Sequence, residues 1–157
     1  MSLQFPQPPL HIRAPQKTEM RTQFGALCYR IVKDRPQILL VTSRGSGRWI
    51  IPKGWPQHKA TPAQAAATEA WEEAGVRGRI VDQCIGLYSY FKEVDKGGQL
   101  PCAVLVYPIK VKALADAFPE AGERKRRWFS CKKAAAQVEE PELRHLLRGF
   151  DPRLVRR

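Results

Sequence analysis

The sequence predicts one α/β domain built around a mixed β-sheet. Segments typical of strands and helices follow one another in the order strands, helix, strands, helices, which indicates an α/β or α+β domain. The length of 157 residues suits a single domain that buries roughly two thirds of its unfolded surface. No apolar run approaches the ~20 residues that cross a bilayer, so we expect no membrane span.

The first part of the chain is expected to be an arm followed by short strands. Residues 1–20 are rich in proline, which predicts a loosely held arm without the apolar core of a secretory signal. The segment 37–43 is continuously apolar and predicts a strand buried on both faces. The elements expected here are strands at 22–32, 37–43 and 48–52, a turn at 34–36, and loops at 44–47 and 53–60.

The clearest helix begins after Thr61 and ends before Gly75. Thr61 and Gln64 have the spacing of a capping box, with Pro62 at the first helical position. Gly75 can adopt the left-handed conformation that ends a helix. Alanines recur at helical period, which predicts close packing against a sheet. They are Ala63, Ala66, Ala67, Ala70 and Ala74.

The rest of the domain is expected to contain two long β segments and two further helices. Residues 77–91 are apolar and β-like, and Pro108 indicates an edge strand or a bulge. Pro141 marks the start of the last helix. The elements expected are strands at 77–91, 100–114 and 127–130, loops at 92–99 and 119–126, helices at 132–138 and 141–150, and a basic tail at 151–157.

The composition bears on partners and location. A net charge of +12 favours anionic ligands, phosphates or nucleic acid, although it is also compatible with simple solubility. The four cysteines form no C-x-x-C pair, and their spacing fits neither a zinc site nor a disulfide scaffold. We therefore expect reduced, mostly buried thiols in a cytoplasmic protein.

Three glutamates are concentrated on one face of the helix. Glu69, Glu72 and Glu73 have i, i+3 and i+4 spacing, and no lysine or arginine between Thr61 and Gly75 neutralises them. A hard divalent cation suits such oxygen-only ligation, Mg²⁺ above all with Mn²⁺ as a substitute, and would bridge to substrate phosphates. The alternative is a solvated acidic face, which is common on helices.

The spacing around these glutamates resembles the Nudix box, G-x5-E-x7-R-E-U-x-E-E-x-G-U, where U is aliphatic. The box's first glutamate is Ala60 here, and its arginine is Thr68. Losing both members of a supporting pair costs less than losing one, so the pattern favours a variant subfamily over a decayed box. The matching positions are Gly54, Glu69, Ala70, Glu72, Glu73, Gly75 and Val76.

The resemblance implies a Nudix α/β/α sandwich over residues 21–150. Within that family the sequence is most similar to the diphosphoinositol polyphosphate and diadenosine polyphosphate hydrolases, through residues 39–44, 48–54 and 123–129. In that group the loop after the second strand and a basic stretch near the end contact phosphates. The phosphate ligands implied here are Thr42, Ser43, Arg44, Arg48 and Lys53, with Arg124 and Arg126 as weaker candidates. The basic run 124–127 could instead be solvated or contact RNA.

The same resemblance implies a Mg²⁺-dependent pyrophosphohydrolase that cleaves a diphosphate linkage in an anionic organic substrate. That substrate would be a diadenosine polyphosphate, a diphosphoinositol polyphosphate or a related nucleoside diphosphate derivative. The metal would be held by Glu69, Glu72, Glu73 and the carbonyl of Gly54. Candidates for the general base are Glu69, Glu93 and Glu120.

Two alternatives remain open on the sequence. One is a catalytically weak Nudix domain that binds nucleotide or RNA, favoured by Ala60, Thr68 and the basic C-terminal region. The other is an unrelated α/β domain with an acidic surface. A small diphosphate is the expected partner, nucleic acid is less favoured, and no oligomeric state is indicated.

The aromatic residues have plainer interpretations. Tyr88, Tyr90 and Phe91 are more typical of a strand in the core than of stacking on a nucleobase. Trp55 could equally line the pocket or pack against the domain.

Overall fold

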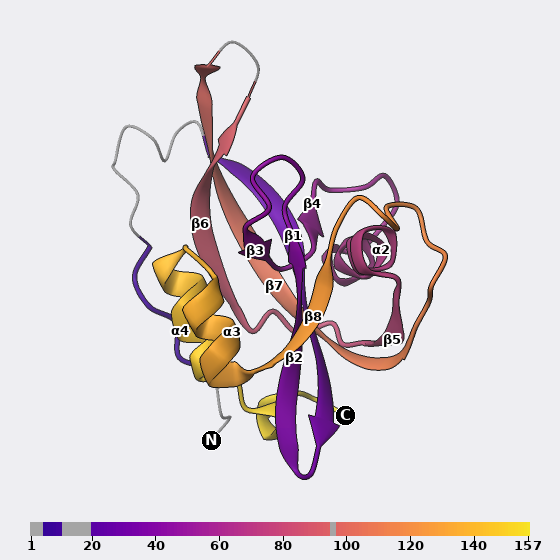
Figure 1. The fold of residues 1–157 in the computed structure, drawn as a ribbon. Helices are drawn as coiled ribbons and strands as arrows, with labels where there is room; N and C mark the ends of the chain where they lie inside the picture. Colours follow the sequence, from indigo (N-terminus) through magenta and orange to yellow (C-terminus); the bar gives the residue numbers. More distant parts are fainter. Residues whose placement is uncertain (1–4, 11–19, 95–96) are drawn as a thin grey trace.

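The structure is a computed structural model that describes residues 5–10, 20–94 and 97–157 (Figure 1). In the described part, no helix is both long and apolar enough to cross a membrane. The strands are β1 (Arg21–Val32), β2 (Arg35–Thr42), β3 (Trp49–Ile50), β4 (Lys53–Gly54), β5 (Val76–Ile80), β6 (Gly86–Glu93), β7 (Gln99–Leu114) and β8 (Arg126–Ser130). The helices are α2 (Pro62–Ala74), α3 (Cys131–Gln137), α4 (Pro141–Arg148) and the short 3₁₀ helix η2 (Pro152–Leu154).

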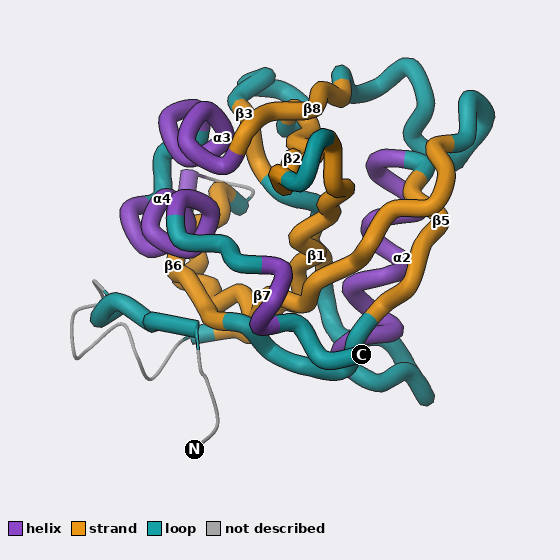
Figure 2. The backbone as a smooth tube through the Cα atoms, turned by 90° about the horizontal axis from the view of Figure 1, so that it is seen from below, coloured by secondary structure: helices purple, strands orange, loops and turns teal. Residues whose placement is uncertain are grey.

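The strands of the described residues form one mixed sheet. The main order is β3-β2-β1-β7-β5, with β4 on β1, β6 on β7 and β8 on β2. The central pair β1–β7 is parallel and the other pairs are antiparallel. Figures 1 and 2 show α2 on one face of the sheet and α3 with α4 on the other. The expected α/β/α sandwich with a mixed sheet is therefore confirmed.

Helix α2 has the ends that the sequence predicts. The Thr61 hydroxyl accepts a hydrogen bond from the Gln64 amide, and the Gln64 side chain accepts one from the Thr61 amide. Gly75 has φ 67°, in the left-handed region. The alanine face packs in a core cluster with side chains of β1, β2 and β7. This packing fixes the rotation of the helix, so its glutamates border the core and do not point to the far side.

The expected single β segment at 77–91 is two strands. Strand β7 is long enough to pair with β6 along its first half and with β5 along its second half. Pro108 lies at the break, where its carbonyl accepts from the Val81 amide at 3.3 Å and its own nitrogen has no proton to donate. Pro108 is thus in a central strand, so the edge expectation was wrong. The bulge lies further along, between Arg77 and Gly78.

The segment around Pro52 also differs from expectation. A strand over 48–52 and a loop from 53 were expected, whereas β3 covers Trp49–Ile50 and β4 covers Lys53–Gly54. The Pro52 carbonyl accepts from Ala26 at 2.9 Å, and Gly54 pairs with Phe24 of β1. Gly54 is therefore held by the sheet. The turn between β1 and β2 lies at Lys33 and Asp34, both with positive φ.

The C-terminal segment after Arg148 is attached to the domain. The Gln83 side chain donates to the Leu154 carbonyl at 3.0 Å and accepts from the Arg156 amide at 2.8 Å. Val155 packs against the core on the face covered by α3 and α4. The expected N-terminal arm lies mostly outside the described residues, and its boundary stays a prediction.

Candidate active site

A cavity of about 570 Å³ opens beside the acidic face of α2. Its walls come from α2, β4, β6 and the loops that follow β2 and β7. Four acidic side chains line it, Glu69, Glu72, Glu73 and Glu120, and four cationic ones, Arg44, Lys53, Lys92 and Arg124. The two signs balance within this cavity, although the whole chain has net charge +12.

Strand β4 positions two of the glutamates. The Lys53 amide donates to Glu73 Oε2 at 3.2 Å. A Cβ added to Gly54 would overlap the Glu69 carboxylate, so the absence of a side chain there lets Glu69 lie against the strand. Backbone and carboxylate oxygens are thereby brought to one border of the cavity.

Arg124 is the buried counter-ion of the acidic group. Its side chain is 8% exposed. It lies 3.4 Å from Glu73 Oε1 and 3.0 Å from Glu120 Oε1, and it donates to the Thr42 carbonyl at 3.0 Å. The loop after β7 is thus tied both to α2 and to the end of β2.

Burial and like charge perturb the ionisation of these groups. Burial, followed by the charges of Glu72 and Glu120, raises the pKa of Glu69 to about 7. Burial also raises the pKa of Glu73, against the opposing effects of Arg124 and Lys53. Burial lowers the pKa of Lys53, although Glu73 favours its charged form. Glu69 has no ion pair among the described residues, and its carboxylate accepts a hydrogen bond from the Gln57 side-chain amide at 3.4 Å.

The donor set suits a hard divalent cation. Among the described residues, no three acidic, histidine or cysteine side chains already converge closely enough to hold an ion. Glu69 nevertheless lies in the space that a Cβ of Gly54 would fill, and its raised pKa indicates a carboxylate short of positive charge. Glu72 and Glu73 line the same cavity as Glu69, and Glu73 Oε1 faces Arg124 at 3.4 Å. The residues therefore fit Mg²⁺ or Mn²⁺ in their chemistry.

Aromatic and amide side chains also line the cavity. Lys53 Nζ lies 4.8 Å from the centre of the Tyr90 ring, and the Tyr90 hydroxyl donates to the buried Gln23 side chain at 2.6 Å. Trp55 lines the cavity and is 40% exposed. Tyr88 is buried in the core, as expected, whereas Phe91 is exposed.

The predicted phosphate ligands divide into two groups. Ser43, Arg44, Lys53 and Arg124 line the cavity. Arg44 reaches Glu120 and Glu123 at 3.5 Å each and is otherwise exposed. The cavity lining does not include Thr42, Arg48 or Arg126.

Each of these three residues has a structural partner instead. The Thr42 hydroxyl accepts from the Lys125 amide at 2.9 Å. Arg48 donates to the buried Glu140 at 2.6 Å. Arg126 donates to the Ala74 carbonyl at the end of α2 at 2.7 Å. Their expected contact with phosphate stays a prediction, and it would require each residue to leave or share its present partner.

Some cavity residues had not been anticipated. Gln23 comes from β1 and Lys92 from β6, so only strand pairing brings them to the site. Gln57 lies three residues after Gly54, and its side-chain amide donates to Glu69. The two box positions that are charged in the motif, Ala60 and Thr68, are uncharged here. The Thr68 hydroxyl instead donates to the Gln64 carbonyl.

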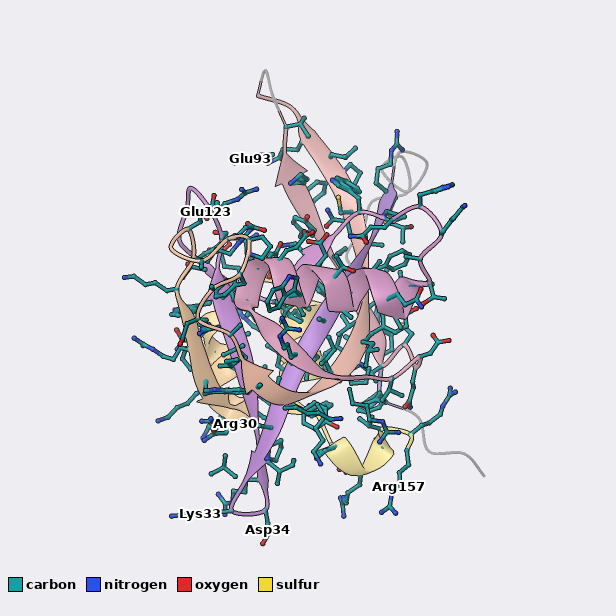
Figure 3. All side chains as sticks on the ribbon, turned by 90° about the vertical axis from the view of Figure 1, so that its right-hand side faces the viewer. Arg30, Lys33, Asp34, Glu93, Glu123 and Arg157 are labelled. Carbon is teal, nitrogen blue, oxygen red and sulfur yellow. The ribbon has the colours of Figure 1, made fainter. Side chains whose placement is uncertain are left out.

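The candidate general bases are also separated. Glu69 and Glu120 line the cavity, whereas Glu93 does not and is exposed at the end of β6. Figure 3 shows Glu93 near the hairpin formed by β6 and β7.

The fold and the site define an α/β/α sandwich whose loop–helix unit presents carboxylates to a cavity that also contains arginine and lysine. Among known protein families, the NUDIX domain matches this chain over residues 21–150. The chain therefore belongs to the Nudix family.

Individual relatives are moderately similar. The chain is 31% identical to a protein of Arabidopsis thaliana named Nudix hydrolase 16, mitochondrial, over 73% of this chain and 65% of the relative. It is 29% identical to human diphosphoinositol polyphosphate phosphohydrolase 3-alpha, over 70% of this chain and 64% of the relative. The chain thus spans slightly less than two thirds of the length of both relatives.

Solved structures show the same fold. A binary complex of C. elegans Ap4A hydrolase has a TM-score of 0.62 at 23% identity, covering 83% of this chain and 94% of that one. The NUDIX domain of Shewanella oneidensis NrtR complexed with ADP ribose has a TM-score of 0.63 at 14% identity, covering 92% and 95%.

Proposed function

We propose that this protein is a pyrophosphohydrolase that requires a divalent cation and cleaves a diphosphate linkage in a highly anionic organic substrate. The observation that carries the proposal is that the three box glutamates line the same cavity as Arg44, Lys53 and Arg124. Carboxylates that hold a cation and side chains that bind phosphate are the two requirements of such chemistry.

The cation would be held by Glu69, Glu72, Glu73 and the carbonyl of Gly54, and Mg²⁺ with Mn²⁺ as a substitute suits these donors. When bound, it would neutralise phosphate oxygens and lower the pKa of a water molecule. Glu73 is the residue that must change partner, because its Oε1 now faces Arg124 at 3.4 Å.

The cationic side chains would bind the phosphates. The Arg44 guanidinium is exposed at the mouth and can turn towards an anion with its planar pair of donors. Lys53 lies deeper, between Glu73 and Tyr90, and offers a point charge. Arg124, once released from Glu73, would face the same space.

Two carboxylates that line the cavity could accept a proton, Glu69 and Glu120. Glu69 has a pKa near neutrality in the absence of a cation, but a bound cation would lower it. Glu120 belongs to the loop after β7 and lies outside the box sequence, although its amide donates to the Glu72 carbonyl at 2.9 Å. Comparing the pH–rate profiles of Glu69→Gln and Glu120→Gln separates these two roles.

The substrate class follows the relatives. Their names include diphosphoinositol polyphosphate phosphohydrolase and Ap4A hydrolase. We accordingly propose a diphosphoinositol polyphosphate, a diadenosine polyphosphate or a related nucleoside diphosphate derivative as the substrate. We also propose a cytoplasmic location from the free cysteines, while two Arabidopsis thaliana relatives are named mitochondrial.

A substrate panel tests the proposal. Diadenosine tetraphosphate, a diphosphoinositol pentakisphosphate, a nucleoside diphosphate sugar and 5′-triphosphorylated RNA would be incubated with Mg²⁺ and the products resolved by chromatography. We expect turnover of at least one of the first two, lost with chelator and in Glu73→Gln. Lys132→Gln, an exposed change on α3, is the matched control. Wild-type turnover by Glu73→Gln would overturn the metal assignment.

A second candidate is a Nudix domain that binds a nucleotide without hydrolysing it. The contacts of Arg124 with Glu73 and Glu120 favour it, because they neutralise the acidic group without a metal. Saturable binding of panel compounds with no product over prolonged incubation with Mg²⁺ would support this candidate.

A further inference from the structure

A second cavity, of about 600 Å³, lies where the C-terminal segment crosses the sheet. Its lining comes from β1, the turn after it, β5, β7 and residues 152–157. It shares no lining residue with the candidate active site among the described residues. Figure 3 shows Asp34 and Arg157 at one end of the molecule and Glu93 and Glu123 towards the other.

The floor of this cavity is a row of side chains on three neighbouring strands. Tyr29 is paired with Lys110, and Lys110 is paired with Arg79. Residues directly opposite each other in a sheet project from the same face. The two cations therefore lie side by side, next to the Tyr29 ring.

The wall of the cavity is the C-terminal segment, and it is held in place. Gln83 makes two hydrogen bonds to this segment, and Val155 packs on the core. Asp151 accepts from the Arg153 side chain at 2.8 to 3.2 Å. These contacts hold the segment against the domain, so Arg156 and Arg157 are kept at the edge of the cavity.

The cations of this cavity outnumber its acids. Five of them line it, and Asp34 is the one acidic residue in the described lining. Arg153 is paired with Asp151. Within the described residues, no ion pair involves Arg79, Lys110, Arg156 or Arg157. All four are exposed, and such a concentration of positive charge attracts anions to this part of the surface.

We propose that this cavity binds a small organic polyphosphate at a site separate from the candidate active site. Arg79, Lys110, Arg156 and Arg157 supply donors for phosphate oxygens. Ile31, Val81 and Val155 supply an apolar side for the organic part of the ligand. The ligand class that satisfies both is a nucleoside diphosphate or triphosphate.

The shape of the site favours a small ligand over nucleic acid. Small-molecule pockets span about 300–1,000 Å³, and this cavity lies within that range. Single-stranded nucleic acid is bound along an extended basic groove, with aromatic side chains on which successive bases stack. Tyr29 is the one aromatic residue in the described lining, and it is buried.

The test is binding of ATP and of inorganic tripolyphosphate in the presence of a chelator. Without a divalent cation, the acids and bases of the active-site cavity balance, so it should attract phosphate less than the C-terminal cavity, whose cations outnumber its acids. We expect saturable calorimetric binding to the wild-type protein, with amide shifts in nuclear magnetic resonance spectra at Gln83 and Arg156. Tighter binding of ATP than of tripolyphosphate is expected, because only ATP contacts the apolar side.

Matched variants separate the site from general charge. Arg79→Gln/Lys110→Gln should weaken ATP binding at least ~10-fold, since each loses a charge-assisted hydrogen bond. Lys132→Gln/Lys133→Gln removes the same charge from α3 and should change it less than ~2-fold. If the first variant unfolds, Arg156→Gln/Arg157→Gln tests the same loss of ATP binding with residues that lie outside the sheet.

Three results would overturn the proposal. They are equal weakening by the site and control variants, amide shifts centred on Lys53 and Gly54, and the absence of saturable binding. A single-stranded oligonucleotide that bound more tightly than ATP through the same residues would replace the small ligand with nucleic acid. Each result leaves the proposed hydrolase activity untouched, because that activity is measured with Mg²⁺ on the first cavity.

Discussion

At the scale of single residues, Gly54 matters because a side chain there would meet a neighbouring carboxylate, and not because its backbone conformation needs glycine. A Cβ there would overlap the Glu69 carboxylate. We expect Gly54→Ala to displace Glu69 and to lower kcat at least ~10-fold, a loss of about 1.4 kcal/mol of transition-state stabilisation, while raising the Mg²⁺ concentration needed for half-maximal activity. Steady-state kinetics over a Mg²⁺ titration would measure both.

A glycine without such a contact provides the control. A Cβ added to Gly98 would lie 3.3 Å from Val94, far less crowded than at Gly54, so Gly98→Ala should retain activity. Unchanged Mg²⁺ dependence in Gly54→Ala would show that Glu69 does not hold the cation.

The ionisation of Glu69 gives a pH prediction. Its pKa rises from 4.5 to about 7 on folding without a cation. A carboxyl whose pKa is raised contributes stability below its unfolded pKa, and this contribution is lost as the pH rises through the folded pKa. Metal-free protein should therefore lose stability between pH 5 and 7.5, by on the order of 1 kcal/mol after allowing for solvent screening at this half-buried group.

Glu69→Gln isolates this contribution. Urea unfolding at the two pH values, with chelator present, should show a smaller pH dependence in the variant, with Glu73 responsible for part of the remainder because its pKa is also raised. An identical dependence in the two proteins would contradict the assignment.

Single residues differ in how far the sequence could place them. Glu69, Glu72 and Glu73 could be assigned to the cavity because one helix and a fixed spacing determine their relation. Gln23 and Lys92 could not be assigned, because they reach the cavity only through strand pairing. Arg48 and Arg126 are of a residue type that binds phosphate. Their observed partners, Glu140 and the Ala74 carbonyl, belong to other elements, so the sequence alone could not indicate them.

At the scale of elements, Arg48 and Glu140 connect the start of β3 to the start of α4. Arg48 lies 2.6 Å from Glu140 Oε2, and Glu140 Oε1 is buried without a hydrogen-bond partner among the described residues. Arg48→Ala would leave a buried carboxylate unpaired, and we expect it to lower the free energy of unfolding by about 2 kcal/mol. Urea denaturation monitored by tryptophan fluorescence would measure the loss.

The double variant Arg48→Met/Glu140→Gln is the comparison for this pair. It removes both charges, so it should be more stable than Arg48→Ala. If Arg48→Ala instead had the same free energy of unfolding as the wild type and a higher KM, the result would support the phosphate contact that the sequence predicts for Arg48.

Elements with local signals were predictable, and those set by distant contacts were not. The ends of α2 follow from a capping box and a glycine, all within the helix and its flanks. The division of 77–91 into β5 and β6 depends on Pro108, which pairs with this region only in the folded sheet. Strand β4 likewise exists because β1 is beside it.

At the scale of the whole molecule, charge and cavities are distributed unevenly. Acids and bases balance in the cavity beside α2, whereas the cavity at the C-terminal segment is strongly basic. The net charge of +12 therefore does not describe the candidate active site. It predicts anionic partners in general, but the location of the unneutralised charge depends on the fold.

The balance of charge beside α2 leads to a prediction about global stability. A cation that binds the folded protein and not the unfolded chain stabilises it by RT ln(1 + [L]/Kd), about 2.7 kcal/mol at 100 times Kd. For a chain of this length, each kcal/mol raises Tm by roughly 2–4 °C. Saturating Mg²⁺ should therefore raise Tm by roughly 5–10 °C, measured by differential scanning calorimetry, and most strongly above pH 7, where Glu69 is ionised.

Glu72→Gln/Glu73→Gln supplies the control, because it removes two carboxylates but keeps side chains of the same size. Its Tm should be nearly independent of Mg²⁺, and NaCl at matched ionic strength should reproduce only the small general effect of screening. An equal Mg²⁺ shift in wild type and variant would place the cation elsewhere. No shift in either would mean that the contacts of Arg124 with Glu73 and Glu120 already neutralise the acidic group, as the non-hydrolysing alternative requires.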